Sequence, residues 1–323
     1  MKTFFLLLTL FTYTVSSAQL FDDIDDVLAA TSEDAKRLID AYVSPLGKSL
    51  SYSLNGGWAS SAKTHKKFGF DLTFGAVSPS VPDGAKTFAI DKLNLQQLKH
   101  SENTASTIFG ANKPTTLTFT STSGTETKVD LPGGIEEELI LNSLPTPYIQ
   151  AGIGLFYDTD VMVRYIPKIK NQGAEFGLIG VGVKHNLMQY FGLLDKLPLN
   201  IAALASFSKM DVDYRLNSLN PDQKVSYDVN TFVVQALASL DFPVISVVAG
   251  IGFGKGDVTM LMLGNYASIN PSLPKDPIHI ENTYTGSHAM VGLRANLLFL
   301  KIFANYTLQE YNTLNAGVSF SFR

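Results

Sequence analysis

The sequence contains no cysteine, so a disulfide framework, thiol catalysis and cysteine metal ligands are excluded. Charge is also scarce, because charged residues make up 17% of the 323 residues and the formal net charge is −4. There is no basic run that could follow a phosphate backbone, and we therefore expect no nucleic-acid partner. Beyond Val15 the chain has no long, charge-free apolar run, so we expect no transmembrane helix in the mature protein.

The short motifs of common active sites are missing as well. Neither H-E-x-x-H nor G-x-S-x-G occurs, and the 5 histidines are scattered. "GIGFGKG" (250–256) fits neither a dinucleotide fingerprint nor a Walker loop. Ser287 and His288 are neighbours on a predicted strand, where adjacent residues point to opposite faces. We therefore predict no enzyme activity, no cofactor and no metal site, with a barrel lipase as an alternative.

The N-terminus has the three parts of a secretory signal peptide. Lys2 is followed by an apolar run, Phe4–Val15, and then by small residues up to Ala18. We predict cleavage after Ala18, so that residues 1–18 are removed. The apolar run is shorter than the ~20 residues that a spanning helix needs. An exported chain without such a helix is either soluble or a membrane β-barrel.

Residues 20–46 have the apolar spacing of a helix. Ser32 is a candidate N-cap, and Pro45 with Gly47 predicts the end of the helix. We predict that residues 19–47 form a helical hatch that plugs the barrel described next.

After Gly47 apolar and polar residues alternate with a period of two, which predicts strands over 48–323. Eleven segments follow this pattern, beginning with the short stretch 50–54. Many have ~10 residues or more, the length that a tilted strand needs to cross a bilayer. Short turns alternate with long polar loops, which is typical of outer-membrane barrels.

A barrel whose two ends lie on the same side of the membrane has an even number of strands. We therefore predict at least one further strand in the long, irregular insertion 80–146, where 86–91 and the hairpin-like stretch 115–131 are the candidates. The predicted fold class is all-β: a transmembrane antiparallel barrel of about 12 strands, with a range of 10–14.

The terminal stretch "NTLNAGVSFSFR" (312–323) has one apolar and one polar face. In a closed barrel the last strand pairs with the first, so we expect it to be firmly held, with its apolar row facing lipid. Four aromatic side chains near the end of the chain are predicted members of an interfacial girdle: Tyr306, Tyr311, Phe320 and Phe322.

Charged residues within the predicted strands fall on the polar parity. A charge facing lipid at mid-membrane costs about 2–4 kcal/mol, so these side chains are expected to face the lumen. The candidate lumen-facing residues are Arg164, Arg294, Lys184 and Asp71, with Lys301 on the same parity. The alternate glycines of 250–256 predict a strand face without side chains, against which a plug can pack.

The stretch "LPTPYIQAGIGLFYDTDVMVRYIPKI" (Leu144–Ile169), together with the signal peptide and the helical N-terminal segment, resembles FadL-like long-chain fatty-acid transporters. Within that group the chain is similar to a set of outer-membrane proteins from Bacteroidetes-type bacteria. The resemblance implies an N-terminal hatch in the barrel and hydrophobic ligands that pass through it.

We therefore expect a monomeric, porin-like barrel in the bacterial outer membrane, in contact with its lipid. The expected function is passive binding or uptake of a small hydrophobic solute. The alternative is a structural barrel that presents its surface loops, especially those of 80–146, to a partner. A soluble, secreted β-sandwich is a further alternative to the membrane barrel.

Overall fold

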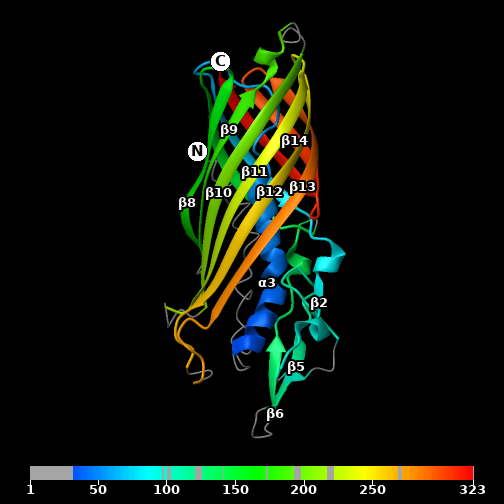
Figure 1. Ribbon diagram of the computed structural model, residues 1–323, viewed down its shortest axis with the longest axis vertical. Helices are drawn as coiled ribbons and strands as arrows, with labels where there is room; N and C mark the ends of the chain where they lie inside the picture. Colours follow the sequence, from blue (N-terminus) through cyan, green and yellow to red (C-terminus); the bar gives the residue numbers. More distant parts are fainter. Residues whose placement is uncertain are drawn as a thin grey trace.

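The computed structural model describes residues 32–96, 98–99, 103–120, 126–140, 142–171, 174–192, 198–216, 222–267 and 271–322. The predicted signal peptide and the residues up to Thr31 lie outside these ranges. In the described part, ten antiparallel strands close into a barrel in the order β1-β15-β14-β13-β12-β11-β10-β9-β8-β7. Figure 1 shows the long strands running around a single helix, α3.

The ten barrel strands differ widely in length. They are β1 (Phe70–Pro79), β7 (Thr146–Gly154), β8 (Thr159–Asn171), β9 (Ala174–Asn186), β10 (Leu199–Arg215), β11 (Lys224–Asp241), β12 (Ile245–Leu263), β13 (Ile278–Leu297), β14 (Leu300–Leu308) and β15 (Thr313–Phe322). We call the end of the barrel where β15 finishes the C-terminal end. The opposite end, from which residues 80–145 emerge between β1 and β7, is the insert end.

The barrel closes through its first and last strands. β1 and β15 pair antiparallel from Phe70↔Phe322 to Pro79↔Thr313. The rings of Phe70 and Phe322 stack with centroids 5.1 Å apart. The expectation that the terminal strand is held by pairing with the first strand is confirmed.

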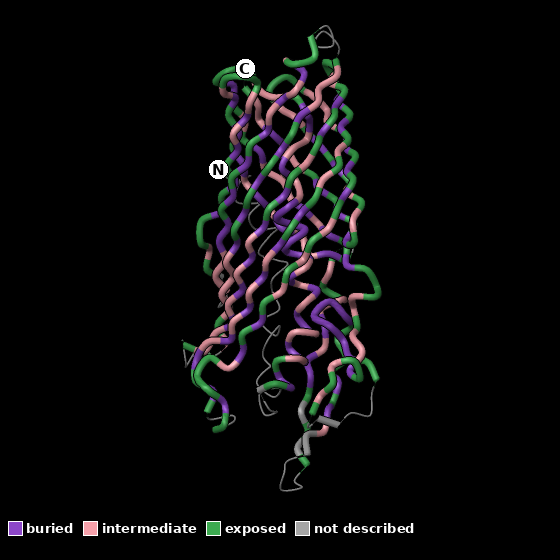
Figure 2. Tube along the Cα trace, in the orientation of Figure 1, coloured by how far each residue is buried: buried purple, intermediate pink, exposed green. Residues whose placement is uncertain are grey.

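Alternation along the strands sorts side chains between the lumen and the outer surface, and Figure 2 shows buried and exposed residues alternating along the barrel. Toward the insert end, the outward side chains of β11–β13 are mostly polar, with Leu261 and Leu263 as exceptions; the polar ones include Ser226, Asp228, Lys255, Asp257, Thr283 and Thr285. Toward the C-terminal end they are apolar and exposed, among them Phe232, Val234, Leu240, Ile251, Phe253, Val291 and Leu293. The change is staggered by one outward residue from strand to strand, since the apolar Phe232 pairs with Lys255 and the apolar Phe253 with Ser287.

These outward apolar residues form what we call the apolar belt. On β11 it runs from Phe232 to Leu240, which matches the ~9–11 residues that a tilted strand needs to cross the hydrocarbon core. The insert-end halves of β11–β13 therefore extend beyond the belt as a wall that is mostly polar on its outer side.

Helix α3 (Ser32–Asn55) packs against the inner side of this wall. Asp40 accepts a hydrogen bond from Nδ2 of Asn282 at 2.7 Å, and the carbonyl of Ser44 accepts one from the Tyr284 hydroxyl at 3.0 Å. Among the described residues, no helix combines the length and the apolar character that crossing a bilayer requires.

The helix boundaries predicted from the sequence were wrong at the C-terminal side. α3 continues through Pro45 and Gly47 to Asn55, and the alternating stretch 50–54 is helical rather than a strand. Pro45 cannot donate a backbone hydrogen bond within the helix. The nearby carbonyl of Tyr42 accepts a hydrogen bond from the amide of Ile108 at 3.0 Å, so contacts with the insert stabilise this part of the helix.

The insertion forms a separate unit outside the barrel. β2 (Thr87–Ala89) pairs with β4 (Thr104–Ser106), and β3 (Leu98–Lys99) pairs with the hairpin of β5 (Thr115–Thr120) and β6 (Glu126–Leu131). Short 3-10 helices lie at Asp83–Ala85, Ile90–Leu93 and Glu136–Glu138, and another follows β9 at Met188–Tyr190. We call the described residues of 80–145 the insert; Figure 1 places it beside α3.

The predicted fold class, an all-β antiparallel barrel with an N-terminal helix, is confirmed. Ten strands form the barrel in the described part of the chain, within the predicted range of 10–14 and below the central estimate of 12. The prediction of a further barrel strand in 80–146 was wrong for both candidates. The stretch 86–91 contributes β2, which pairs with β4, and the hairpin at 115–131 pairs with β3, all within the insert. The first barrel strand begins at Phe70, not at residue 48.

A hydrophobic core joins α3, the insert and the extended wall. Leu38, Ile39 and Tyr42 of the helix pack with Ile108 and Phe109 of the insert. On the wall side the cluster includes Tyr227, Val229, Met260, Ile278 and Ile280. Tyr311, predicted to join the aromatic girdle, is instead buried and packs against Tyr52, with ring centroids 5.6 Å apart.

The alternate glycines of β12 form the groove that receives the helix. Ser51 and Asn55 lie one helical turn apart on the same face. A Cβ on Gly256 would lie 2.5 Å from Cβ of Ser51, and one on Gly254 would lie 2.7 Å from Nδ2 of Asn55. The prediction that this glycine row accommodates a packed interior element is confirmed.

Gly256→Ala should therefore displace α3 from β12 and lower the free energy of unfolding by about 1–3 kcal/mol, a typical effect of overpacking. The measurement is the urea midpoint of the purified protein. Gly84→Ala is the matched control, because a Cβ there meets nothing within 4 Å. Equal midpoints for both variants would contradict the packing described here.

Candidate functional site

Between α3 and β1 the chain crosses the barrel at the height of the apolar belt. This stretch, residues 56–66, is called the lumen segment and contains neither helix nor strand. Gly57 has a φ of +74°, a left-handed conformation that glycine adopts without strain at the end of a helix. A Cβ on Gly182 of β9 would lie 2.9 Å from the Trp58 ring, so the glycine makes room for the indole.

Arg164 of β8 binds the start of the lumen segment. It is 1% exposed, and its guanidinium lies between the rings of Trp58 and Tyr148, at 4.2 and 4.1 Å from their centroids. It donates hydrogen bonds to the carbonyl of Gly56 and to Oε1 of Gln150, both at 3.0 Å. The cation thus faces the C-terminal end of α3, where the helix dipole concentrates negative charge.

The irregular backbone of the lumen segment obtains its hydrogen bonds from wall side chains. The carbonyl of Trp58 accepts from Nε2 of Gln150 at 3.3 Å, and that of Ala59 accepts from Nδ2 of Asn305 at 3.1 Å. The amide of Ala62 donates to Oγ of Ser239 at 3.0 Å. Since unpaired backbone groups at membrane depth are costly, these wall residues make the segment's path stable.

Lys184 of β9 holds the next part of the segment. Its ammonium group donates to the carbonyl of Lys63 at 2.8 Å and forms an ion pair with Asp160 at 3.2 Å. Asp160 in turn accepts from the backbone amide of His65 at 2.9 Å and lies 3.1 Å from its Nδ1. A single buried ion pair therefore fixes two positions of the lumen segment.

The other two predicted residues line the lumen nearer the C-terminal end. Arg294 forms an ion pair with Asp241 at 3.0 Å, and Asp241 also accepts from Oγ of Ser61 at 2.8 Å. Asp71 lies 3.6 Å from Nε2 of His65. All four predicted lumen residues thus lie on the inner face of the barrel, on four different strands, and each contacts the lumen segment directly or through one intermediate residue.

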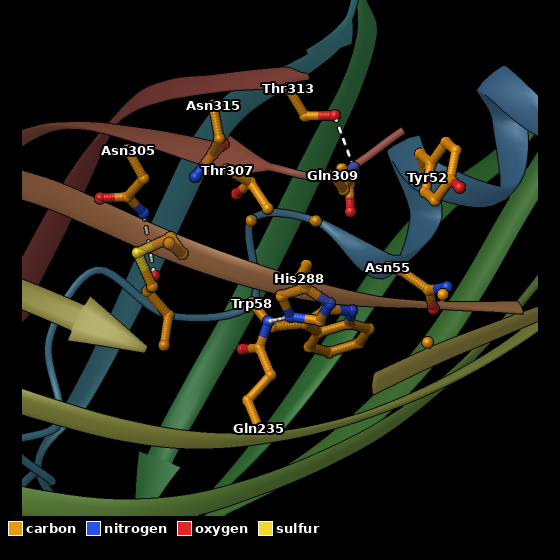
Figure 3. Close-up of a pocket in the computed structure, with 16 residues that line it drawn as sticks. Tyr52, Asn55, Trp58, Gln235, His288, Asn305, Thr307, Gln309, Thr313 and Asn315 are labelled. Carbon is orange, nitrogen blue, oxygen red and sulfur yellow. Dashed lines mark hydrogen bonds between the residues drawn. The ribbon is translucent and has the colours of Figure 1, made fainter. Parts of the chain in front are cut away.

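A small cavity remains beside the lumen segment, and Figure 3 shows the polar side chains around it. Asn305 and Asn315 lie on one side, and Gln235 with His288 lies on the other, joined by a hydrogen bond of 2.8 Å. The cavity volume is about 20 Å³, room for about one water molecule. His288 lies inside, whereas the neighbouring Ser287 is exposed outside, so the pair considered for a lipase does not meet.

A larger cavity opens on the other side of the segment, toward the C-terminal end. We call this cavity the vestibule; its volume is about 830 Å³. The lumen segment forms its floor, and charged side chains of the wall line it, including Asp71, Lys184, Arg294 and Lys301. Within the described ranges no group of three or more His, Asp or Glu residues could hold a metal ion.

Sequence reasoning missed the residues that the lumen segment itself contributes. The signal that was present is the single tryptophan, Trp58, which follows two glycines in a stretch without periodicity. The wall partners Gln150, Asn305 and Ser239 stand on the same parity as the charged candidates. Only the position of the lumen segment distinguishes them from other polar lumen residues.

Arg164→Gln should weaken the attachment of the lumen segment. We expect the free energy of unfolding to fall by about 1.5–3 kcal/mol, the usual contribution of hydrogen bonds to a charged group. The fluorescence of Trp58 during urea unfolding measures the change. Lys209→Gln removes one positive charge from the outer face of β10 and should leave the midpoint unchanged; similar losses in both variants would contradict the role of Arg164.

The barrel is similar to several solved structures of low sequence identity. Ail, the attachment invasion locus protein of Yersinia pestis, is 9% identical, with 80% of this chain and 100% of that chain covered and a TM-score of 0.28. The translocator domain of autotransporter NalP from Neisseria meningitidis is 9% identical, with coverage of 88% and 96% and a TM-score of 0.32. The P. putida toluene transporter TodX is 10% identical, with coverage of 79% and 90% and a TM-score of 0.20.

Likenesses of this strength carry no argument about function, and the resemblance of Leu144–Ile169 to FadL-like transporters stays a prediction. No curated protein matches the chain. One protein family, described as "Family of unknown function (DUF6588)", matches residues 1–322. Because this match extends over almost the entire chain, the protein belongs to that family.

Proposed function

We propose that the protein is an outer-membrane barrel that its own lumen segment keeps closed and that holds the insert at the cell surface. The apolar belt supports the membrane location, because a closed sheet leaves no unpaired edge and its outward side chains suit lipid. The long loops of outer-membrane barrels face outward, which favours an extracellular insert end. The chain closes its barrel alone, so a monomer suffices.

The observation that carries this proposal is the filled lumen. At the height of the belt the lumen segment is bonded to the wall on several sides, and the space beside it is about 20 Å³. Among the described residues, this cavity is too small for a solute larger than water. A closed barrel with a folded unit on one end fits an anchor better than a pore.

The insert is suited to presentation because α3 holds it in place. The hydroxyl of Tyr42 donates to the carbonyl of Gly133 at 2.8 Å, and Nη1 of Arg37 donates to that of Leu93 at 3.2 Å. Outside the barrel, the hydrogen bonds that the Lys86 ammonium group donates to the carboxylates of Asp83 and Glu136 raise the pKa of Lys86 above its usual value. These contacts favour one orientation of the insert, as a surface that recognises a partner requires.

Solute uptake is a second candidate, favoured by the vestibule. Its volume lies in the range of small-molecule sites, ~300–1,000 Å³. The charged lining suits a polar solute better than the hydrophobic solute that the sequence predicted. Passage through the barrel would require the lumen segment to move away from the wall.

The orientation can be tested with cysteine labelling, for which the cysteine-free sequence is an ideal background. Lys113→Cys places a thiol in the insert, and Leu298→Cys places one in the turn between β13 and β14, where Leu298 is 93% exposed. A membrane-impermeant maleimide should label the first variant on intact cells and the second only after permeabilisation. The reverse pattern would show that the insert faces the periplasm, and labelling of both on intact cells would contradict a membrane-spanning barrel.

The two candidate functions are separated by tethering the lumen segment. Oγ of Ser61 lies 3.2 Å from Oγ of Ser239, so a Ser61→Cys/Ser239→Cys variant brings two thiols close enough to test for a disulfide. If the protein is an anchor, swelling of proteoliposomes in small sugars should be negligible in both the oxidised and the reduced forms.

Swelling that appears on reduction and disappears on oxidation would instead establish uptake with a moving segment. The single variants Ser61→Cys and Ser239→Cys are the controls, because neither can form the tether. Substantial swelling of the same extent in both redox states would contradict closure by the lumen segment.

A further inference from the structure

The vestibule combines a defined volume with an uneven distribution of charge. Its floor carries Lys63 and Lys66 of the lumen segment, and its wall carries Lys301 of β14. Phe242, Val244 and Leu298 lie at its mouth, in the turns of the C-terminal end. Low-dielectric walls around charges of one sign concentrate their field on whatever enters.

The carboxylates of the vestibule already accept hydrogen bonds or form ion pairs within the protein. Asp71 accepts hydrogen bonds from Thr73 at 2.7 Å and from Ser319 at 2.9 Å. Asp160 and Asp241 are engaged with Lys184 and Arg294 as described above. The negative charge of the cavity is therefore committed to structural contacts.

Three ammonium groups are not committed in this way. Within the described ranges, Lys63, Lys66 and Lys301 form no ion pair with a carboxylate, although all three line the cavity. The charges near Lys301 are the like charges of Arg294 and Lys63 and the opposite charges of Asp71 and Asp241. An anion among the three lysines would offset the repulsion between Lys301 and Lys63.

We propose that the vestibule binds a phosphate group between Lys63 of the lumen segment and Lys301 of the wall, with Lys66 adding a third positive charge. Lysine binds phosphate as a compact point charge, and the several oxygens of a phosphate group can accept hydrogen bonds from more than one ammonium group. The ligand is either a free phosphate or phosphorylated solute, or the phosphate of a lipid headgroup that enters past the apolar mouth.

The site also links the ligand to closure of the barrel. Lys63 belongs to the irregular lumen segment, whereas Lys301 belongs to the hydrogen-bonded sheet. A phosphate that bridges the two adds a contact between segment and wall. This consequence rests on the proposed closed state, but binding itself does not.

The single tryptophan makes the site measurable, because Trp58 lines the vestibule. The full mature chain is placed in phosphatidylcholine nanodiscs and titrated with inorganic phosphate at constant ionic strength. We expect a saturable change in fluorescence, which chloride does not produce. Lys301→Gln and Lys63→Gln should each weaken the apparent affinity at least tenfold.

Lys113→Gln is the matched control, since it removes the same charge from the insert at the opposite end of the barrel, and its affinity should equal that of the unmodified chain. The heat-modifiability shift on gels checks that every variant is folded. Unchanged affinity in both vestibule variants, an equal response to chloride, or no response either to added phosphate or to the anionic lipid described next would overturn the proposal.

A second arm identifies the source of the phosphate. In nanodiscs that contain phosphatidylglycerol, a lipid-derived ligand should produce the fluorescence change before any phosphate is added, and Lys301→Gln should abolish it. A change that requires added phosphate in both lipids supports a free ligand. Because the readout is binding and not flux, its failure is distinguishable from failure of the tethering experiment.

Discussion

The structure depends on the hydrogen bonds through which side chains of the wall stabilise an irregular backbone inside the barrel. Beyond Gly56, whose amide still donates to the carbonyl of Tyr52, the lumen segment belongs to no helix or strand, yet it is surrounded by the wall at the height of the apolar belt. Each unpaired backbone group there would cost several kcal/mol. Side chains of the wall provide the partners: Arg164 for Gly56, Asn305 for Ala59 and Lys184 for Lys63.

This requirement explains the charges in the lumen. Arg164 has the end of a helix and two aromatic rings in place of a carboxylate. A guanidinium is suited to this position because it is planar, stacks on aromatic faces and donates in several directions. Lys184 and Asp160 compensate one another's charge. Their remaining hydrogen-bonding groups contact the lumen segment. Most charged side chains in the lumen thus bind the protein's own lumen segment, and lysines without an ion-pair partner among the described residues line the vestibule.

The unequal strands follow from a second packing constraint. β11–β13 continue past the belt, and α3 packs against their inner faces, so that helix and strands bury each other's apolar side chains. The insert covers the remaining side of the helix, so the core at the insert end contains parts of all three. The helix spans the distance from the insert to the lumen segment, which mechanically joins the surface unit to the interior of the barrel.

Much of the barrel could be predicted from the sequence, because alternation with a period of two reports which face of a strand meets lipid. The inward parity of Arg164 and Lys184, the pairing of the terminal strand and the glycine groove of β12 all follow from such local patterns. The stretch 50–54 misled the same reasoning. A stretch this short also fits the helical period of 3.6, in which Ser51 and Asn55 lie on one face. Five residues are too few to distinguish that period from the period of two of a strand.

The sequence by itself determined that this chain forms long, two-faced antiparallel strands with polar and glycine-rich inner faces. Only the tertiary structure decided what occupies the lumen, how many strands close around it and where the insert lies. The physical reason is that periodicity records the environment of each residue, inside or outside, but not the identity of its neighbour. The path of residues 56–66 has no period at all, and it is defined by contacts with strands that lie far away in the sequence.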